Sequence, residues 1–158
     1  MDVIEQEIEN FKAIVPYADE ATMVLKAHLL IEQGLWKFIT ARIDDDALIK
    51  ELRGKYSSVA TGKALVQLAR AVAALDEIPI TNGDKLWPAL KQLNDLRNTL
   101  VHELEPSRKL IEKPMREIAR TVLGESSTDL NREFYGATQL LLAYLAIDRT
   151  PSTLSDVD

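Results

Sequence analysis

The sequence has no cysteine and few residues that interrupt regular structure, with six glycines and six prolines among 158 residues. The absence of cysteine excludes disulfide scaffolds, thiolate metal sites and cysteine nucleophiles. No apolar run approaches the roughly 18 residues that a membrane-spanning helix needs. The acidic start, Met1-Asp2-Val3-Ile4-Glu5, also lacks the basic and apolar regions of a signal peptide. These absences predict a cytoplasmic protein that does not enter a membrane.

Strand signals are also missing, because no segment alternates β-branched and polar residues. Hydrophobic residues instead recur at helical spacing between breakers. The hydrophobic fraction of 46% and the charged fraction of 28% are those of a globular chain. We therefore expect one all-α domain over residues 1–149, an up-and-down helical bundle, and a flexible tail over residues 150–158.

Breakers and periodicity together predict seven helices. Apolar positions nearly surround the second, so it should be the central helix. Asp84 should cap the fifth helix, which Pro106 should stop, and Pro114 should interrupt or begin the sixth, which Gly124 should close. A loop is expected over residues 76–83. The expected helices span residues 2–14, 19–43, 47–55, 58–75, 84–104, 108–123 and 128–147.

The net charge of −6 does not favour nucleic acid as a partner, but the charge is uneven. Residues 1–34 hold seven acidic and two basic side chains. Two basic clusters follow, which can act locally because salt screens charges over about 8 Å. They can equally be ordinary solvated helix faces. The clusters comprise Lys50, Arg53, Lys55, Lys63 and Arg70, and Arg108, Lys109, Lys113, Arg116 and Arg120.

Only two histidines occur, so the search for catalytic groups is short. His102 ends a helical stretch that is unusually polar for one that must also pack, Leu93 to His102. Arg97 stands on the apolar stripe of this helix, where a guanidinium is costly unless it is paired. Arg97 and His102 diverge by about 140° on a regular helix, so they cannot meet within one helix. A two-fold dimer that pairs this helix with its copy could surround one cleft with both groups.

The segment Arg97-Asn98-Thr99-Leu100-Val101-His102 resembles the signature of the HEPN family, an arginine, a polar residue and, after three further residues, a histidine. The stretch from Ala27 to Gln33 also resembles the long first core helix of small prokaryotic HEPN proteins. The similarity covers about residues 15–147. It implies a HEPN-type bundle with additional short helices, and it implies a site at Arg97, Asn98 and His102 without cofactor or metal.

Active members of the family are metal-independent endoribonucleases that work as dimers. The resemblance implies that the ribose 2′-hydroxyl attacks the adjacent phosphodiester and leaves a 2′,3′-cyclic phosphate. His102 would transfer the proton, Arg97 would stabilise charge on the phosphoryl oxygens, and Asn98 would orient His102 or the phosphate. Such an enzyme would be a component of a toxin–antitoxin or antiviral defence system, with RNA as substrate and a cognate antitoxin as partner.

Other functions stay open. In some HEPN toxins a tyrosine two residues after the histidine is modified by the antitoxin, but Leu104 occupies that position, so this control is not expected. One alternative is a non-catalytic regulator that resembles the mannitol-operon repressor group. Another is an antitoxin or interaction protein that neutralises a partner enzyme. In either case Arg97 and His102 could simply pair with Asp95 and Glu103.

The remaining distinctive side chains favour structural roles. His28 lies near an apolar stripe and is interpreted as a core histidine with Glu32, one turn later, as its partner. Trp36 and Trp87 are interpreted as core or interface anchors rather than base-stacking platforms. The apolar run from Leu140 to Leu145 predicts a buried helix or a dimer interface.

Overall fold

The computed structural model describes residues 2–75, 80, 82–103, 107–124 and 129–146. These residues form seven α-helices and no strand, which confirms the predicted all-α class. The helices are α1 (Val3–Ile14), α2 (Glu20–Thr40), α3 (Asp46–Leu52), α4 (Gly62–Leu75), α5 (Gly83–His102), α6 (Arg108–Leu123) and α7 (Leu130–Ala146).

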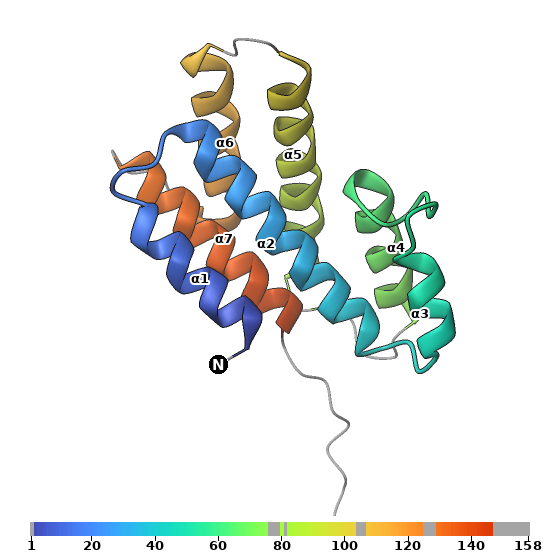
Figure 1. Ribbon diagram of the computed structural model, residues 1–158. Coiled ribbons are helices and arrows are strands. Elements are labelled where there is room, and N and C mark those ends of the chain that lie inside the picture. Colours follow the sequence, from blue (N-terminus) through green and yellow to red (C-terminus); the bar gives the residue numbers. More distant parts are fainter. Residues whose placement is uncertain (1, 76–79, 81, 104–106, 125–128, 147–158) are drawn as a thin grey trace, which may run out of the picture.

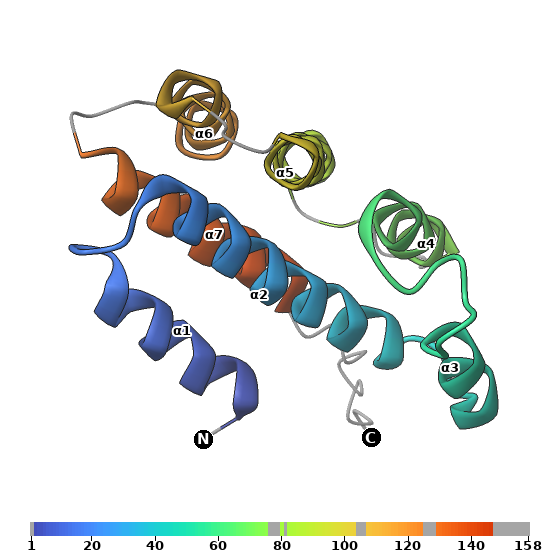
Figure 2. The ribbon, with the colours of Figure 1, turned by 45° about the horizontal axis from the view of Figure 1, so that its top comes forward.

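Helix α2 is the central element of the bundle (Figure 1). It contacts α1, α4, α5, α6 and α7, and eleven of its 21 residues are buried, as its apolar pattern predicts. Figure 2 shows α4, α5 and α6 side by side in one layer over α2 and α7, with α1 on the opposite side. Helix α5 therefore has one side against the core and one side on the surface.

The α2–α7 contact is the most extensive between any two helices. Gly34 makes it close, because a Cβ atom at this position would lie 2.8 Å from Leu142 Cδ2. Leu141, Leu142 and Leu145 are buried, so the apolar run of the sequence does form a buried helix.

Helix starts follow local capping chemistry. Asp2, Asp19, Asp45 and Ser107 each accept a backbone N–H bond at a helix N-terminus. The prediction that Asp84 caps α5 is wrong. The helix begins one residue earlier, after Asn82, whose φ of 61° is the left-handed conformation that asparagine tolerates.

Two proline and glycine predictions have different outcomes. Gly124 closes α6 with a left-handed φ of 77°, as predicted. Pro114 does not interrupt or begin α6, which runs continuously from Arg108 to Leu123. The proline removes the N–H that would bond the Leu110 carbonyl, and Leu110 is exposed, so water can replace the bond.

The α3–α4 segment explains why α4 starts later than periodicity predicts. Trp36 Nε1 donates to the Ala60 carbonyl oxygen at 3.1 Å, and Gly62 has a left-handed φ of 64°. Both features keep residues 58–61 out of the helix. Trp36 is buried and Trp87 packs partly buried against the core, so both are structural anchors.

Within the described ranges, no helix is long and apolar enough to span a bilayer. The expected tail over residues 150–158, the stop at Pro106 and most of the expected loop over residues 76–83 lie outside the described residues.

Candidate functional site

Helix α5 positions the polar segment through an apolar stripe. Leu86, Leu90, Leu93 and Leu96 are almost completely buried, so they fix the rotation of the helix against the core. Arg97 follows directly and is half-buried, with Asn98 beside it in a similar environment. The stripe therefore holds a guanidinium at the rim of the core rather than in open solvent.

Arg97 and Asn98 act as a unit. Arg97 Nη1 donates a hydrogen bond to Asn98 Oδ1 at 3.3 Å, which directs the planar guanidinium along the helix. No carboxylate among the described residues forms an ion pair with Arg97, Asp95 included. A half-buried guanidinium without a counter-ion retains donors for an anionic ligand.

His102 is the last residue of α5, and its side chain is exposed. It lies one turn after Asn98, about 40° around the helix, but about 140° from Arg97. Its imidazole makes no ion pair with Glu103 in the described structure, so the proposed structural pairs of Arg97 with Asp95 and of His102 with Glu103 are both absent there. One protomer thus brings Arg97 to Asn98 but not to His102.

Residues of α2, α4 and α5 form a polar cluster around His28, and the sequence predicts only part of it. His28 is 8% exposed, and its Nδ1 lies 3.7 Å from Glu32 Oε1, which is the partner that helical spacing predicts. The same carboxylate oxygen accepts the Gly62 N–H at 3.1 Å, at the start of α4. Asn94 of α5 is 5% exposed, and a Cβ atom on Gly62 would lie 3.3 Å from its Oδ1. Nothing in the local sequence signals that α4 and α5 meet at His28.

The surroundings of His28 lower its pKa from the ordinary value of 6.5. Burial lowers the pKa of His28 most strongly, and the Arg97 guanidinium lowers it further. Glu32 and, more weakly, Asn94 act in the opposite direction and raise this pKa. The net shift of this pKa is downward, so folding favours the uncharged imidazole.

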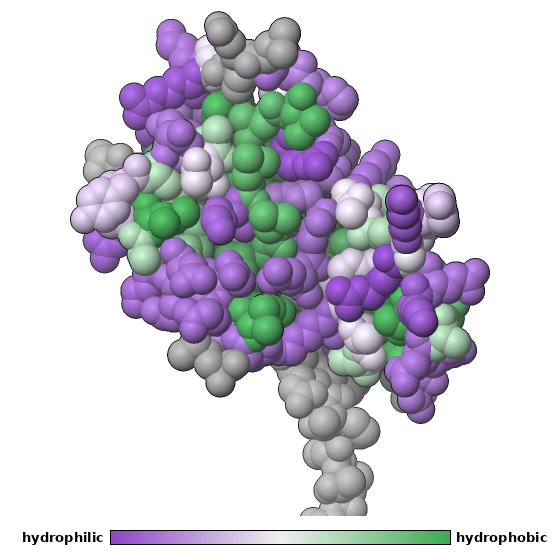
Figure 3. All heavy atoms as spheres, in the orientation of Figure 1, coloured by the Kyte–Doolittle hydropathy of each residue, from purple (hydrophilic) through white to green (hydrophobic). Residues whose placement is uncertain are grey.

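Exposed apolar side chains occur on the helices around this segment. Leu25 and Leu29 of α2 are 43% and 56% exposed, Val101 of α5 is 55% exposed, and Leu110 of α6 is 49% exposed. Figure 3 shows an apolar strip along α2 that extends to the ends of α5 and α6. Contiguous apolar surface of this kind is typical of protein–protein contact.

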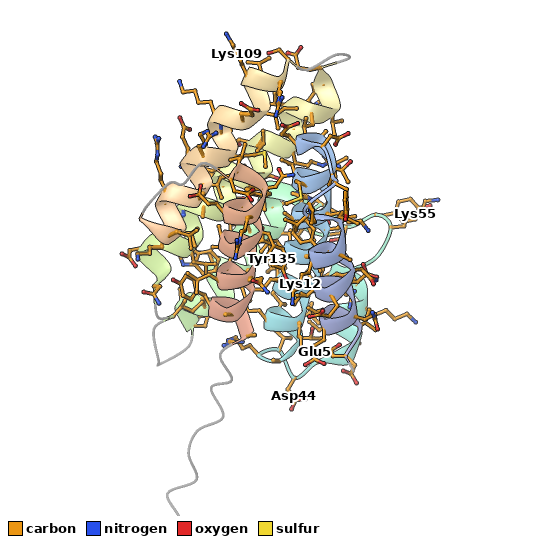
Figure 4. All side chains as sticks on the ribbon, turned by 90° about the vertical axis from the view of Figure 1, so that its left-hand side faces the viewer. Glu5, Lys12, Asp44, Lys55, Lys109 and Tyr135 are labelled. Carbon is orange, nitrogen blue, oxygen red and sulfur yellow. The ribbon has the colours of Figure 1, made fainter. Side chains whose placement is uncertain are left out.

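A separate groove of about 1270 Å³ lies between α1, α6 and α7. Figure 4 shows Lys12 of α1 and Tyr135 of α7 on this side of the molecule. The groove contains neither histidine and neither Arg97 nor Asn98. Four basic and four acidic side chains line it, so it favours no ligand charge. They are Lys12, Arg108, Arg116 and Arg132, and Asp19, Glu20, Glu112 and Asp129.

The part of the chain that the structure describes contains no group of three or more His, Cys, Asp or Glu side chains that could hold a metal ion. Comparison of the chain with protein-family models, with curated proteins and with solved structures finds no match.

Proposed function

We propose that this protein is a metal-independent endoribonuclease of the HEPN type that acts as a homodimer through Arg97, Asn98 and His102. The observation that carries the proposal is the state of Arg97, which is half-buried, bonded to Asn98 and without a carboxylate partner among the described residues. Leaving a guanidinium in this state is costly for a purely structural residue. A phosphodiester oxygen would complete its hydrogen bonds.

The reaction is intramolecular transesterification. The 2′-oxygen of the ribose forms a bond to phosphorus as His102 accepts its proton, and the bond from phosphorus to the 5′-oxygen breaks. The leaving 5′-oxygen takes a proton from the protonated imidazole of His102 in the second copy, and the product is a 2′,3′-cyclic phosphate. Arg97 binds the phosphoryl oxygens, and Asn98 fixes its guanidinium. Proton transfer of this kind is worth about 10²–10⁴-fold in rate.

A dimer is needed because Arg97 and His102 point apart on one helix. The exposed Val101 lies between them in sequence, and Leu25 and Leu29 are exposed on the neighbouring α2. An apolar surface that surrounds the site is suited to an isologous contact, in which each copy buries the same side chains. In that arrangement Arg97 of one copy and His102 of the other line a shared cleft.

The surface layer of α4, α5 and α6 supports RNA as the substrate despite the net charge of −6. Lys63 and Arg70 of α4 are exposed, and α4 contains no acidic residue. On α6 three exposed cations lie within about 40° of one another, opposite to the buried Ile111 and Met115. These cations can contact phosphates along a bound strand. They are Lys109, Lys113 and Arg120.

The test is cleavage of mixed RNA by the purified protein in the presence of a chelator. We expect cyclic-phosphate ends, detected by mass spectrometry, and a loss of about 100-fold or more in rate for His102→Ala and for Arg97→Ala. Asp95→Ala is the matched control, because Asp95 is exposed on the same helix. Equal cleavage by the native protein and His102→Ala would overturn the assignment.

The net negative charge favours the second candidate, a regulator, antitoxin or other interaction protein on the same scaffold, in a defence system or an operon. Such a protein cleaves no RNA, and its binding to a protein or nucleic-acid partner survives His102→Ala. Growth arrest on expression of the native chain, lost in His102→Ala, separates the toxin from this candidate.

A further inference from the structure

A basic segment without carboxylates runs from the end of α3 through α4. Residues 52–75 contain four basic and no acidic side chains, whereas the whole chain carries a net charge of −6. All four are exposed, and none forms an ion pair with a described residue. Salt screens charges over about 8 Å, so the positive potential of these groups acts locally. They are Arg53, Lys55, Lys63 and Arg70.

Trp36 of α2 holds both ends of the loop that joins α3 to α4. The Arg53 guanidinium carbon lies 5.2 Å from the centroid of the Trp36 ring, and Trp36 Nε1 donates to the Ala60 carbonyl oxygen at 3.1 Å. The Gly62 N–H then donates to Glu32 Oε1 at 3.1 Å, one turn earlier on α2. The loop is therefore fixed to α2 at both ends and again at the start of α4.

The tip of this loop carries Lys55 and Tyr56. The Ser57 N–H donates to the Gly54 carbonyl oxygen at 3.0 Å, so Lys55 and Tyr56 occupy the two central positions of a β-turn. Ser57 Oγ also accepts the Val59 N–H at 3.2 Å. Tyr56 is 94% exposed, and the Lys55 ammonium lies 5.9 Å from its ring centroid. Figure 4 shows Lys55 projecting from the bundle, so the anchored loop holds an aromatic ring in solvent beside a cation.

The basic side of α4 begins next to the segment of α5 that holds the candidate site. A Cβ atom on Gly62 would lie 3.3 Å from Asn94 Oδ1, so the start of α4 contacts α5 there. Arg97 follows Asn94 by three residues, a rise of about 4.5 Å along the helix. Lys63 and Arg70 are seven residues apart and lie within about 20° of each other around α4, so they form one stripe. This stripe therefore starts close to the level of Arg97.

Exposed cations beside an exposed aromatic ring are the two elements of single-strand nucleic-acid binding. The cations contact phosphates, and the ring stacks on an unpaired base whatever its identity. A duplex keeps its bases within its own stack, so an exposed ring gains nothing from it. Tyr56 contributes little to the bundle by burial, since 94% of its surface is exposed.

We propose that the loop between α3 and α4 and the α4 stripe form a binding site for single-stranded RNA. Tyr56 stacks on a base, Lys55 contacts a phosphate beside it, and the stripe of Lys63 and Arg70 holds the backbone next to Arg97. The choice of RNA rests on the proposed function, but the binding itself can be measured without cleavage.

The first experiment measures binding of an unpaired, fluorescein-labelled 2′-O-methyl RNA of about 12 nucleotides by fluorescence anisotropy. This probe lacks a free 2′-hydroxyl, so the native protein cannot cleave it. We expect Tyr56→Ala to raise Kd at least about fivefold and Tyr56→Phe to retain binding, because stacking needs only the ring. Tyr17→Ala is the matched control, since Tyr17 is 88% exposed between α1 and α2. Tyr56→Ala should not change the Kd for the same strand paired with its complement.

The second experiment follows Kd against salt concentration. For single strands the logarithm of the binding constant falls with the logarithm of salt concentration by about 0.7 for each phosphate that is neutralised. Lys63→Gln and Arg70→Gln should each reduce this slope by about 0.7. Lys12→Gln removes an exposed cation of α1, on the opposite side of the bundle, and should leave the slope unchanged.

Three results would each overturn the binding site. They are an unchanged Kd in Tyr56→Ala, equal losses on single strand and duplex in that variant, and equal salt slopes for Lys63→Gln and Lys12→Gln.

Cleavage assays separate this inference from the proposed function. In an active ribonuclease Tyr56→Ala should raise KM for unpaired RNA and leave kcat unchanged, because the contact is equal in the ground state and the transition state. A protein that binds the probe through Tyr56 but cleaves no RNA overturns the ribonuclease and leaves the binding site intact.

Discussion

Two contacts of α2, one with α7 and one with α5, differ in chemistry. Toward α7 the helix packs Gly34 closely against the buried side chains of Leu142 and Leu145. Toward α5 it presents His28 and Glu32 to Asn94, a polar contact with one unsatisfied oxygen. Apolar contacts need only shape, whereas buried polar groups cost free energy unless every member is satisfied. The α2–α7 contact thus favours stability, whereas the α2–α5 contact includes a buried polar atom without a partner, which costs free energy.

The largest change in the free energy of unfolding is expected at the apolar contact between α2 and α7. Leu141 of α7 is 1% exposed, so Leu141→Ala removes buried methyl groups and leaves a cavity. We expect the free energy of unfolding to fall by about 2–5 kcal/mol, measured by urea denaturation. Gln139→Ala, an exposed site on the same helix, should stay within about 0.5 kcal/mol of the native protein. A loss below 1 kcal/mol at Leu141 would contradict the comparison.

A smaller change in the free energy of unfolding is expected when pH is varied, because His28 lies at the polar contact between α2 and α5. Burial and Arg97 hold the pKa of His28 below the value of 6.5 that it has in the unfolded chain. Between the folded and unfolded values the unfolded state binds more protons, so stability falls as pH falls below about 6.5. His28→Gln should flatten this part of the curve of unfolding free energy against pH. The Asp2 and Asp19 carboxyls, whose pKa is lowered from 3.8 by hydrogen bonds, act only at lower pH.

The smallest change in the free energy of unfolding is expected when the polar side chain of Asn94 is replaced by an apolar one. Asn94→Leu deletes the unpaired oxygen, so the free energy of unfolding should stay within about 1 kcal/mol of the native value or rise. Asn131→Leu is the contrasting variant, since Asn131 donates to the Val15 and Ala18 carbonyls at 3.2 and 2.9 Å. It should lose about 1–3 kcal/mol. Equal losses at the two asparagines would show that Asn94 is satisfied in solution.

Much of the fold could be predicted because its signals are local. Periodicity and breakers place all seven helices, and the all-round apolar pattern of α2 predicts its central position. Errors at the helix starts come from contacts that local rules omit. The Trp36 bond to Ala60 keeps the residues before Gly62 out of α4, and Asn82 takes a conformation that capping preferences do not favour.

The candidate site, too, could be predicted only where its signals are local to one segment of the sequence. The resemblance of one short segment to the HEPN signature predicts Arg97, Asn98 and His102 as the site, and the i, i+4 spacing pairs His28 with Glu32. The burial of Asn94 and the Gly62 bond to Glu32 depend on how α4 and α5 pack on α2, so no single segment encodes them. The dimer that would complete the site stays a prediction.

The two bonds of Asn131 also bear on biosynthesis. They fasten the α1–α2 turn to the first turn of α7, across more than 110 residues of chain. During translation the ribosome releases α1 and α2 long before α7 exists. The turn between α1 and α2 can therefore form these two hydrogen bonds only after α7 has been synthesised.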